Sequence, residues 1–124
     1  MANIILHLGI SLAGYLIITT AATIAVFLKG KKKWFLKGHK AFSAVGVILA
    51  ITGIFLSGFN FIILHAYIGL IASLGCVAAL VLGQLAIVSE KDKKQKRVIH
   101  IWASRAWILT MTANIILGFI MILP

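Results

Sequence analysis

Four uninterrupted apolar runs account for almost the whole of this 124-residue chain. They lie at roughly residues 3 to 28, 38 to 59, 61 to 88 and 99 to 123. Each run has about the 20 residues that an α-helix needs to cross the hydrocarbon core of a bilayer. Only 11% of the residues are charged, whereas an ordinary soluble domain has about 25%. We therefore predict an all-α membrane protein.

The intervals between the apolar runs have only the length of loops. The second interval, "SGFNF" at residues 57 to 61, is as short as a turn. Short connections make consecutive helices antiparallel neighbours, so we expect a single domain over residues 1 to 124, an antiparallel up-down bundle of four transmembrane helices. The first 28 residues carry no charged side chain, and we interpret them as a retained helix, not a cleaved signal peptide.

Nearly all basic residues gather beside two of the three connections. Beside the first they are Lys29, Lys31, Lys32, Lys33, Lys37 and Lys40, and in the third they are Lys91, Lys93, Lys94, Lys96 and Arg97. Lys and Arg near helix ends mark the cytoplasmic side. We therefore expect an integral, four-pass membrane protein with both termini outside and lysine-rich loops in the cytoplasm. Orientation and attraction to anionic lipid then explain most of the net charge of +10, and no nucleic-acid partner is needed.

All four histidines lie near the amino-terminal end of a different predicted helix. Successive helices alternate in direction, so His7 and His65 share the outer layer while His39 and His100 share the inner layer. In an up-down bundle the first and third helices are diagonal neighbours, as are the second and fourth, so each pair could meet across the centre. The alternative is that each histidine is an interfacial residue or joins two helices by a hydrogen bond.

Small residues follow three of the histidines along the same helix face. After His39 they are Ser43, Gly46, Ala50, Gly53 and Ser57, and after His65 they are Gly69, Ala72, Cys76, Ala79 and Gly83. The same face after His7 has Ser11, Gly14, Ile18, Ala21 and Ala25, all small except Ile18. A flat macrocycle needs such room between helices. Closely packed membrane helices also use Gly, Ala and Ser at their contacts, so this feature is compatible with both hypotheses.

Two imidazoles in each layer suit haem better than zinc. Zinc normally takes four N, S or O ligands, and no cysteine or carboxylate stands near either pair. Haem iron receives four nitrogens from the porphyrin and completes its axial positions with two imidazoles, which leaves no open position for oxygen. We therefore expect two b-type haems that transfer electrons. At about 1.5 Å of rise per residue, the two iron layers lie on the order of 20 Å apart.

Four segments carry a pattern that extends beyond the histidines. They are "HLGISLAGYLIITTAATIAVFLK" (7 to 29), "WFLKGHKAFSAVG" (34 to 46), "HAYIGLIASLGCVAALVLGQ" (65 to 84) and "HIWASRAWILTMTANIILGF" (100 to 119). Their most specific parts are Trp34 and Phe35 before His39, His65 with Gly69 and Gln84, and His100 with Arg105, Asn114 and Gly118. In these parts the chain resembles the core helices of the cytochrome b561 and ferric-reductase transmembrane family.

The resemblance implies a di-haem transmembrane electron carrier in which His7 pairs with His65 and His39 pairs with His100. The chain has only the four-helix core, without the flanking helices of the ascorbate-reducible members, and Ser104 stands where the family often has glycine. The electron donor and acceptor therefore stay open, with ascorbate or a quinol among the candidates. The protein would be an oxidoreductase enzyme only if it turns over such a substrate directly.

Three further groups of polar residues are candidate contacts. Arg105, inside an apolar run, costs roughly 2.5 to 3.5 kcal/mol at a helix centre, so we expect it to pair with an inner haem propionate or to extend to the cytoplasmic headgroups. Asn114 is expected level with the outer haem, bonded to a propionate, to a ligand imidazole or to another helix. Lys33, Lys37 and Lys40 surround the cytoplasmic approach, where they could attract an anionic reductant.

Two other classes of function remain open. The first is a small four-helix transporter or channel, but proton-coupled exporters need a carboxylate within the membrane, and both acids, Glu90 and Asp92, fall in a loop. The second is a membrane subunit without a cofactor, which leaves the layered histidines unexplained. A homodimer is compatible with any of these functions.

Overall fold

The computed structural model describes residues 2–31, 33–56 and 64–122. Over these residues the chain is all-helical, with α1 (Ala2–Phe27), α2 (Phe35–Leu56), α3 (Leu64–Val88) and α4 (Lys93–Ile122). Each helix is long and apolar enough to cross a membrane. The prediction of four such helices is confirmed, while the predicted turn at residues 57 to 61 lies outside the described residues.

Helices α2 and α4 both begin several residues before the apolar runs that predicted them, in the basic sequence that precedes each run. The runs start at about residues 38 and 99, whereas α2 begins at Phe35 and α4 at Lys93. Lys, Arg and Gln are good helix formers, so the backbone stays helical beyond the apolar sequence. Two residues in the left-handed region occur in the turns, Gly30 with φ 75° after α1 and Asp92 with φ 58° before α4.

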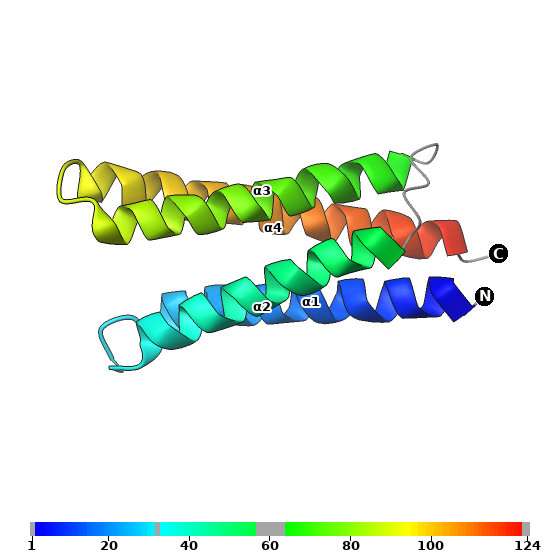
Figure 1. Ribbon diagram of the computed structural model, residues 1–124, viewed down its shortest axis with the longest axis horizontal. Helices are drawn as coiled ribbons and strands as arrows, with labels where there is room; N and C mark the ends of the chain where they lie inside the picture. Colours follow the sequence, from blue (N-terminus) through cyan, green and yellow to red (C-terminus); the bar gives the residue numbers. More distant parts are fainter. Residues whose placement is uncertain (1, 32, 57–63, 123–124) are drawn as a thin grey trace. The chain divides into compact units, whose positions relative to one another are not determined.

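The chain divides into two compact units, Met1–Ile62 and Ile63–Pro124. The first is a hairpin of α1 and α2, and the second is a hairpin of α3 and α4 (Figure 1). Within each hairpin the contacting residues run in opposite order along the two helices; in the first, Ser11 meets Gly53 and Ala21 meets His39. The arrangement of all four helices as one bundle stays a prediction.

Glycines bring α1 and α2 close together at the middle of the first hairpin. A Cβ added to Gly14 would lie 2.9 Å from the amide nitrogen of Ala50 and 3.0 Å from the carbonyl oxygen of Gly46. A Cβ added to Gly46 would lie 2.6 Å from Cγ1 of Ile18. Backbone atoms cannot move aside as the end of a flexible side chain can. Only glycine therefore permits this approach of the two helices.

The second hairpin is packed around one large side chain. The indole ring of Trp107 in α4 lies over Gly75 of α3 so closely that it takes the place of a Cβ. Next to it, the thiol of Cys76 donates a hydrogen bond to Sδ of Met111 at 3.3 Å, and both side chains are buried. The fourth apolar run does not have small residues along the face that follows its histidine. Its Trp107 lies on that face and fills the space that Gly75 leaves on α3.

Large apolar side chains remain exposed on every described helix. Ile5 is 71% exposed, Ile48 62%, Leu74 60% and Leu109 69%. The polar threonine side chains are satisfied within their own helices, because each hydroxyl donates a hydrogen bond to a carbonyl oxygen three or four residues earlier. These threonines are Thr19, Thr20, Thr23, Thr52, Thr110 and Thr112. Apolar surfaces with internally satisfied polar groups suit contact with lipid.

Candidate functional site

Both histidines of the first hairpin are hydrogen-bonded to the backbone of the facing helix. Nδ1 of His7, in α1, lies 2.7 Å from the carbonyl oxygen of Gly53 in α2. Nδ1 of His39, in α2, lies 2.9 Å from the carbonyl oxygen of Ala21 in α1. Both imidazoles are half-buried. The two helices are therefore joined at both ends of the hairpin through a histidine ring.

The second hairpin holds its histidines in the same way. Nδ1 of His65 lies 3.0 Å from the carbonyl oxygen of Asn114, and Nδ1 of His100 lies 2.9 Å from that of Ala79. A carbonyl oxygen only accepts hydrogen bonds, so Nδ1 is the nitrogen that carries the proton. In the neutral ring the lone pair is then on Nε2, for these two histidines as for those of the first hairpin.

The four hydrogen bonds follow one spacing rule. Each acceptor comes fourteen residues after the histidine of its own helix: Ala21 after His7, Gly53 after His39, Ala79 after His65 and Asn114 after His100. Fourteen residues cover about 21 Å of helix and return to nearly the same face. The two hairpins are therefore two copies of one arrangement, with an imidazole at either end.

The histidines of one hairpin are too far apart to act together on a single atom. His39 bonds to Ala21, which follows His7 by about 21 Å of helix. Within the second hairpin the same distance separates His65 from the level of His100. Within one hairpin the two imidazoles therefore lie at opposite ends.

The small residues that follow the histidines pack against the other helix of the same hairpin. A Cβ added to Gly69 would lie 2.9 Å from Nδ2 of Asn114, and the side chain of Ser11 occupies the space beside Gly53. The sequence left two uses of this face open, room for a macrocycle or close helix packing. Within the hairpin the contacts show close packing, since glycine and alanine let the backbones approach and let the imidazoles reach them.

Asn114 lies beside His65. The sequence predicted it at the level of the outer layer of histidines, to which His65 belongs. A hydrogen bond to an imidazole of another helix was among the alternatives predicted for Asn114, and it is made by the backbone carbonyl. The side-chain Oδ1 is buried and has no hydrogen-bond partner among the residues that the structure describes. A buried acceptor without a donor costs about 1–3 kcal/mol. A bound group that donates a hydrogen bond at this position would therefore stabilise the protein.

Arg105 extends toward the basic end of α4. Its guanidinium carbon lies 5.2 Å from the centroid of the Trp102 ring, one turn earlier in the helix. Arg105 is exposed and Trp102 is 64% exposed, and a cation–π contact at such a site contributes about 0.5–1 kcal/mol. The charge stays accessible to an anionic group, which fits both a propionate and a lipid headgroup.

The lysines predicted near a donor site are exposed at the loop end of the first hairpin. Lys33 lies in the turn before α2, and Lys37 and Lys40 lie in its first turns. The second hairpin has its own basic end at the start of α4, where Nζ of Lys96 donates to Oγ of Ser89. Each hairpin thus presents a cluster of positive charge that attracts anions and anionic lipid.

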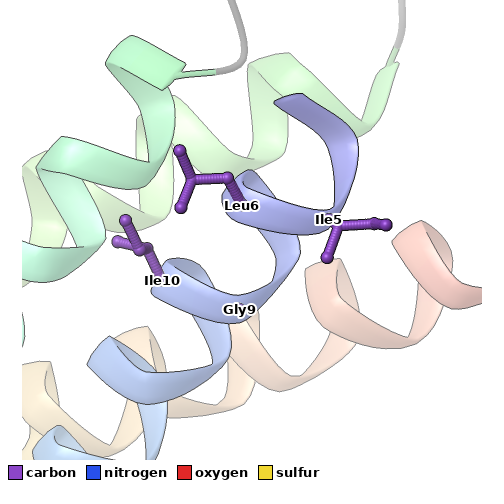
Figure 2. A pocket seen from close by; sticks show the side chains of 4 residues that line it. All are labelled: Ile5, Leu6, Gly9 and Ile10. Carbon is purple, nitrogen blue, oxygen red and sulfur yellow. The ribbon is translucent and has the colours of Figure 1, made fainter. Parts of the chain in front are cut away.

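An open apolar recess lies on the surface of α1 near its amino-terminal end. Ile5, Leu6, Gly9 and Ile10 line it (Figure 2). A Cβ added to Gly9 would meet no atom within 4 Å, so this glycine leaves the helix surface open. An apolar recess of this kind suits an acyl chain or another helix, and it offers no charged group to a polar ligand.

Comparisons with protein-family models, with curated proteins and with solved structures found no match to this chain. The function therefore has to be inferred from the residues and their contacts.

The carbonyl groups that hold the imidazoles were not predicted from the sequence. Every residue has a carbonyl, so residue type gives no signal for them. A fourteen-residue interval from each histidine is the signal that could have found them. The sequence had named Gly53 and Ala79 only as small residues on the histidine face, and Asn114 only as a polar candidate.

Proposed function

We propose that this chain is a di-haem b-type cytochrome, an antiparallel bundle of four transmembrane helices that carries single electrons between a cytoplasmic or membrane-pool donor and an outer acceptor. The common orientation of the four imidazoles supports this proposal most strongly. A metal-binding histidine usually donates its other ring N–H to a carbonyl or carboxylate, which fixes the tautomer and orients the ring. All four histidines have such a partner for Nδ1, and Nε2 is then the nitrogen suited to bind iron.

In this proposal His7 and His65 are the axial pair of the outer haem, and His39 and His100 are the pair of the inner haem. Because each hairpin has one imidazole at each end, one iron takes one ligand from each hairpin. Exchanged pairs, His7 with His100 and His39 with His65, meet this condition too. We favour the first set because both basic connections belong on the cytoplasmic side, which puts His39 and His100 in the same layer.

The remaining residues of the proposed site bind, orient and exclude water. Haem would supply the one-electron redox chemistry. The chain provides both axial nitrogens and an apolar surrounding. Arg105 and Asn114 are candidate partners for propionates, each as a hydrogen-bond donor to an ionised carboxylate, Arg105 through its guanidinium and Asn114 through its side-chain NH2 group. Lys33, Lys37 and Lys40 would attract an anionic donor such as ascorbate to the inner side.

The same hydrogen bonds favour a second candidate function. Histidines that donate to the carbonyl of a neighbouring helix also join membrane helices without any cofactor. In that case the chain would be a structural membrane subunit, and the fourteen-residue rule would describe only how its hairpins are packed.

Haem content separates the two candidates. We expect the purified protein, expressed with ample haem, to contain two low-spin b haems per chain, measured from the reduced-minus-oxidised visible spectrum with haem quantified against protein. A variant with all four histidines changed to alanine is the control for adventitious haem and should be colourless. A colourless wild-type protein would contradict the cytochrome and support the structural subunit.

The proposed topology places the first and third connections in the cytoplasm. In a Cys76→Ala background, cysteines introduced as Lys31→Cys and Lys94→Cys should react with a membrane-impermeant maleimide only after the cells are permeabilised. A cysteine in the second connection, Asn60→Cys, should react on intact cells. The opposite labelling would contradict the orientation expected from the positive charges.

A further inference from the structure

Each histidine of the second hairpin lies against a glycine of the facing helix. A Cβ added to Gly118 would lie 2.8 Å from Cε1 of His65 and 3.4 Å from each of its ring nitrogens. A Cβ added to Gly83 would lie 2.9 Å from Cε1 of His100, 3.2 Å from Nδ1 and 3.4 Å from Nε2. Carbon atoms in favourable contact are about 3.5–4.0 Å apart. A methyl group at either glycine would therefore push against the imidazole ring itself.

The two glycines occupy equivalent positions in the hairpin. Gly83 comes eighteen residues after His65, and Gly118 comes eighteen residues after His100. Eighteen residues are about five helical turns, so each glycine is in line with the histidine of its own helix. Each glycine also follows the acceptor carbonyl by one turn. Every imidazole of this hairpin is thus placed by two successive turns of the facing helix, one that accepts its hydrogen bond and one that lacks a side chain.

The ring cannot escape a new methyl group without changing its own geometry. A rotation or shift of the His65 ring away from position 118 would alter its hydrogen bond to the carbonyl of Asn114, which now measures 3.0 Å. The ring of His100 is restrained in the same way by Ala79, at 2.9 Å. The position of each imidazole therefore depends on the absence of a side chain at the glycine.

The first hairpin differs at the equivalent position. Ala25 comes eighteen residues after His7 and carries a Cβ on the face that corresponds to Gly83. The other equivalent position, Ser57, lies outside the described residues. A glycine at this place is therefore a feature of the second hairpin and not a requirement of the repeated arrangement.

We propose that Gly118 and Gly83 are positioning residues that set the ring orientation of His65 and His100, and thereby the electronic properties of the haem that each histidine binds. This inference rests on the proposed function, because it concerns the ligated imidazoles. Groups around a metal site that orient its ligands also tune the bound metal. Gly118 would act on the outer haem and Gly83 on the inner haem.

The test uses Gly118→Ala and Gly83→Ala in the full chain, with the low-spin ferric electron paramagnetic resonance signal and the midpoint potential of each haem as readouts. We expect Gly118→Ala to shift the signal and potential of the outer haem only, and Gly83→Ala those of the inner haem only. A His39→Ala background isolates the outer haem. Gly9→Ala is the matched control, because its methyl group meets no atom within 4 Å, and it should shift neither haem.

The outcomes distinguish this inference from the proposed function. Glycine variants that keep both haems with unshifted signals and potentials would overturn the positioning role and leave the cytochrome in place. A wild-type protein without haem would overturn both. If one alanine variant does not accumulate, the other carries the test, because Gly118 and Gly83 each lie against the histidine of a different haem. An unshifted signal and potential in that variant would overturn the inference.

Discussion

Replacing His65 with alanine is expected to remove one haem from each chain and to leave the other in place. In the proposed function His65 provides one of the two axial nitrogens of the outer haem, and its ring is already oriented by the carbonyl of Asn114. An alanine supplies no nitrogen, so that haem is lost or bound only weakly. His39→Ala should have the same effect on the inner haem. The ratio of haem to protein measures both changes.

Double variants determine which histidines share an iron. If His7 pairs with His65, the variant with both changed to alanine loses one haem only, whereas the variant with His39 and His65 changed loses both. The exchanged pairs predict the reverse result for the same two proteins. Gln95→Ala, an exposed polar position in the first turn of α4, is the control and should keep both haems. Full haem content in His65→Ala would contradict the assignment of this histidine as a ligand.

The four helices could be predicted because the physical problem has few solutions. An apolar run of bilayer length must satisfy its own backbone groups, and a helix does so within one segment. The first residues of α2 and α4 could not be predicted in the same way, because each helix begins several residues before its apolar run begins. Lys93 and its basic neighbours prolong α4 through their helix propensity, a weak signal beside the strong change in hydropathy.

The use of each helix face was not predictable from the sequence. Periodicity shows that Gly69, Cys76 and Gly83 share a face, but it does not show which helix covers that face. The structure covers it with α4 of the same hairpin. The choice depends on shape, because Trp107 fits the gap at Gly75 and the imidazole of His100 fits the gap at Gly83.

The likeness of the two hairpins is also hidden in the sequence. Thirty-two residues separate His7 from His39, whereas thirty-five separate His65 from His100, so no constant histidine spacing appears. The difference falls in the connections, while the interval from each histidine to the acceptor carbonyl on its own helix is always fourteen. Helix geometry fixes the interval between a histidine and the acceptor on its own helix, but it does not fix the interval between the two histidines of a hairpin.

Gly75→Ala is expected to destabilise the second hairpin by about 1–3 kcal/mol, the usual cost of adding a methyl group to a well-packed core. The ring atoms of Trp107 occupy the position of the new Cβ. These atoms form the rigid body of the indole, so they cannot move aside as a flexible chain end would. Thermal unfolding of the purified protein in detergent should give a lower midpoint than for the wild type. Gly9→Ala should give a midpoint at least as high as that of the wild type, because alanine is about 0.5–1 kcal/mol more favourable than glycine inside a helix.

A second substitution tests whether Trp107 is the cause. Trp107→Leu alone should also lower the midpoint, because it leaves part of the space over Gly75 empty. Combined with Gly75→Ala, it should be less harmful than the sum of the two single changes, since the methyl group then enters space that the indole has left. A double-mutant cycle measures this coupling. Additive effects, or a Gly75→Ala protein as stable as the wild type, would contradict the close packing of Trp107 on Gly75.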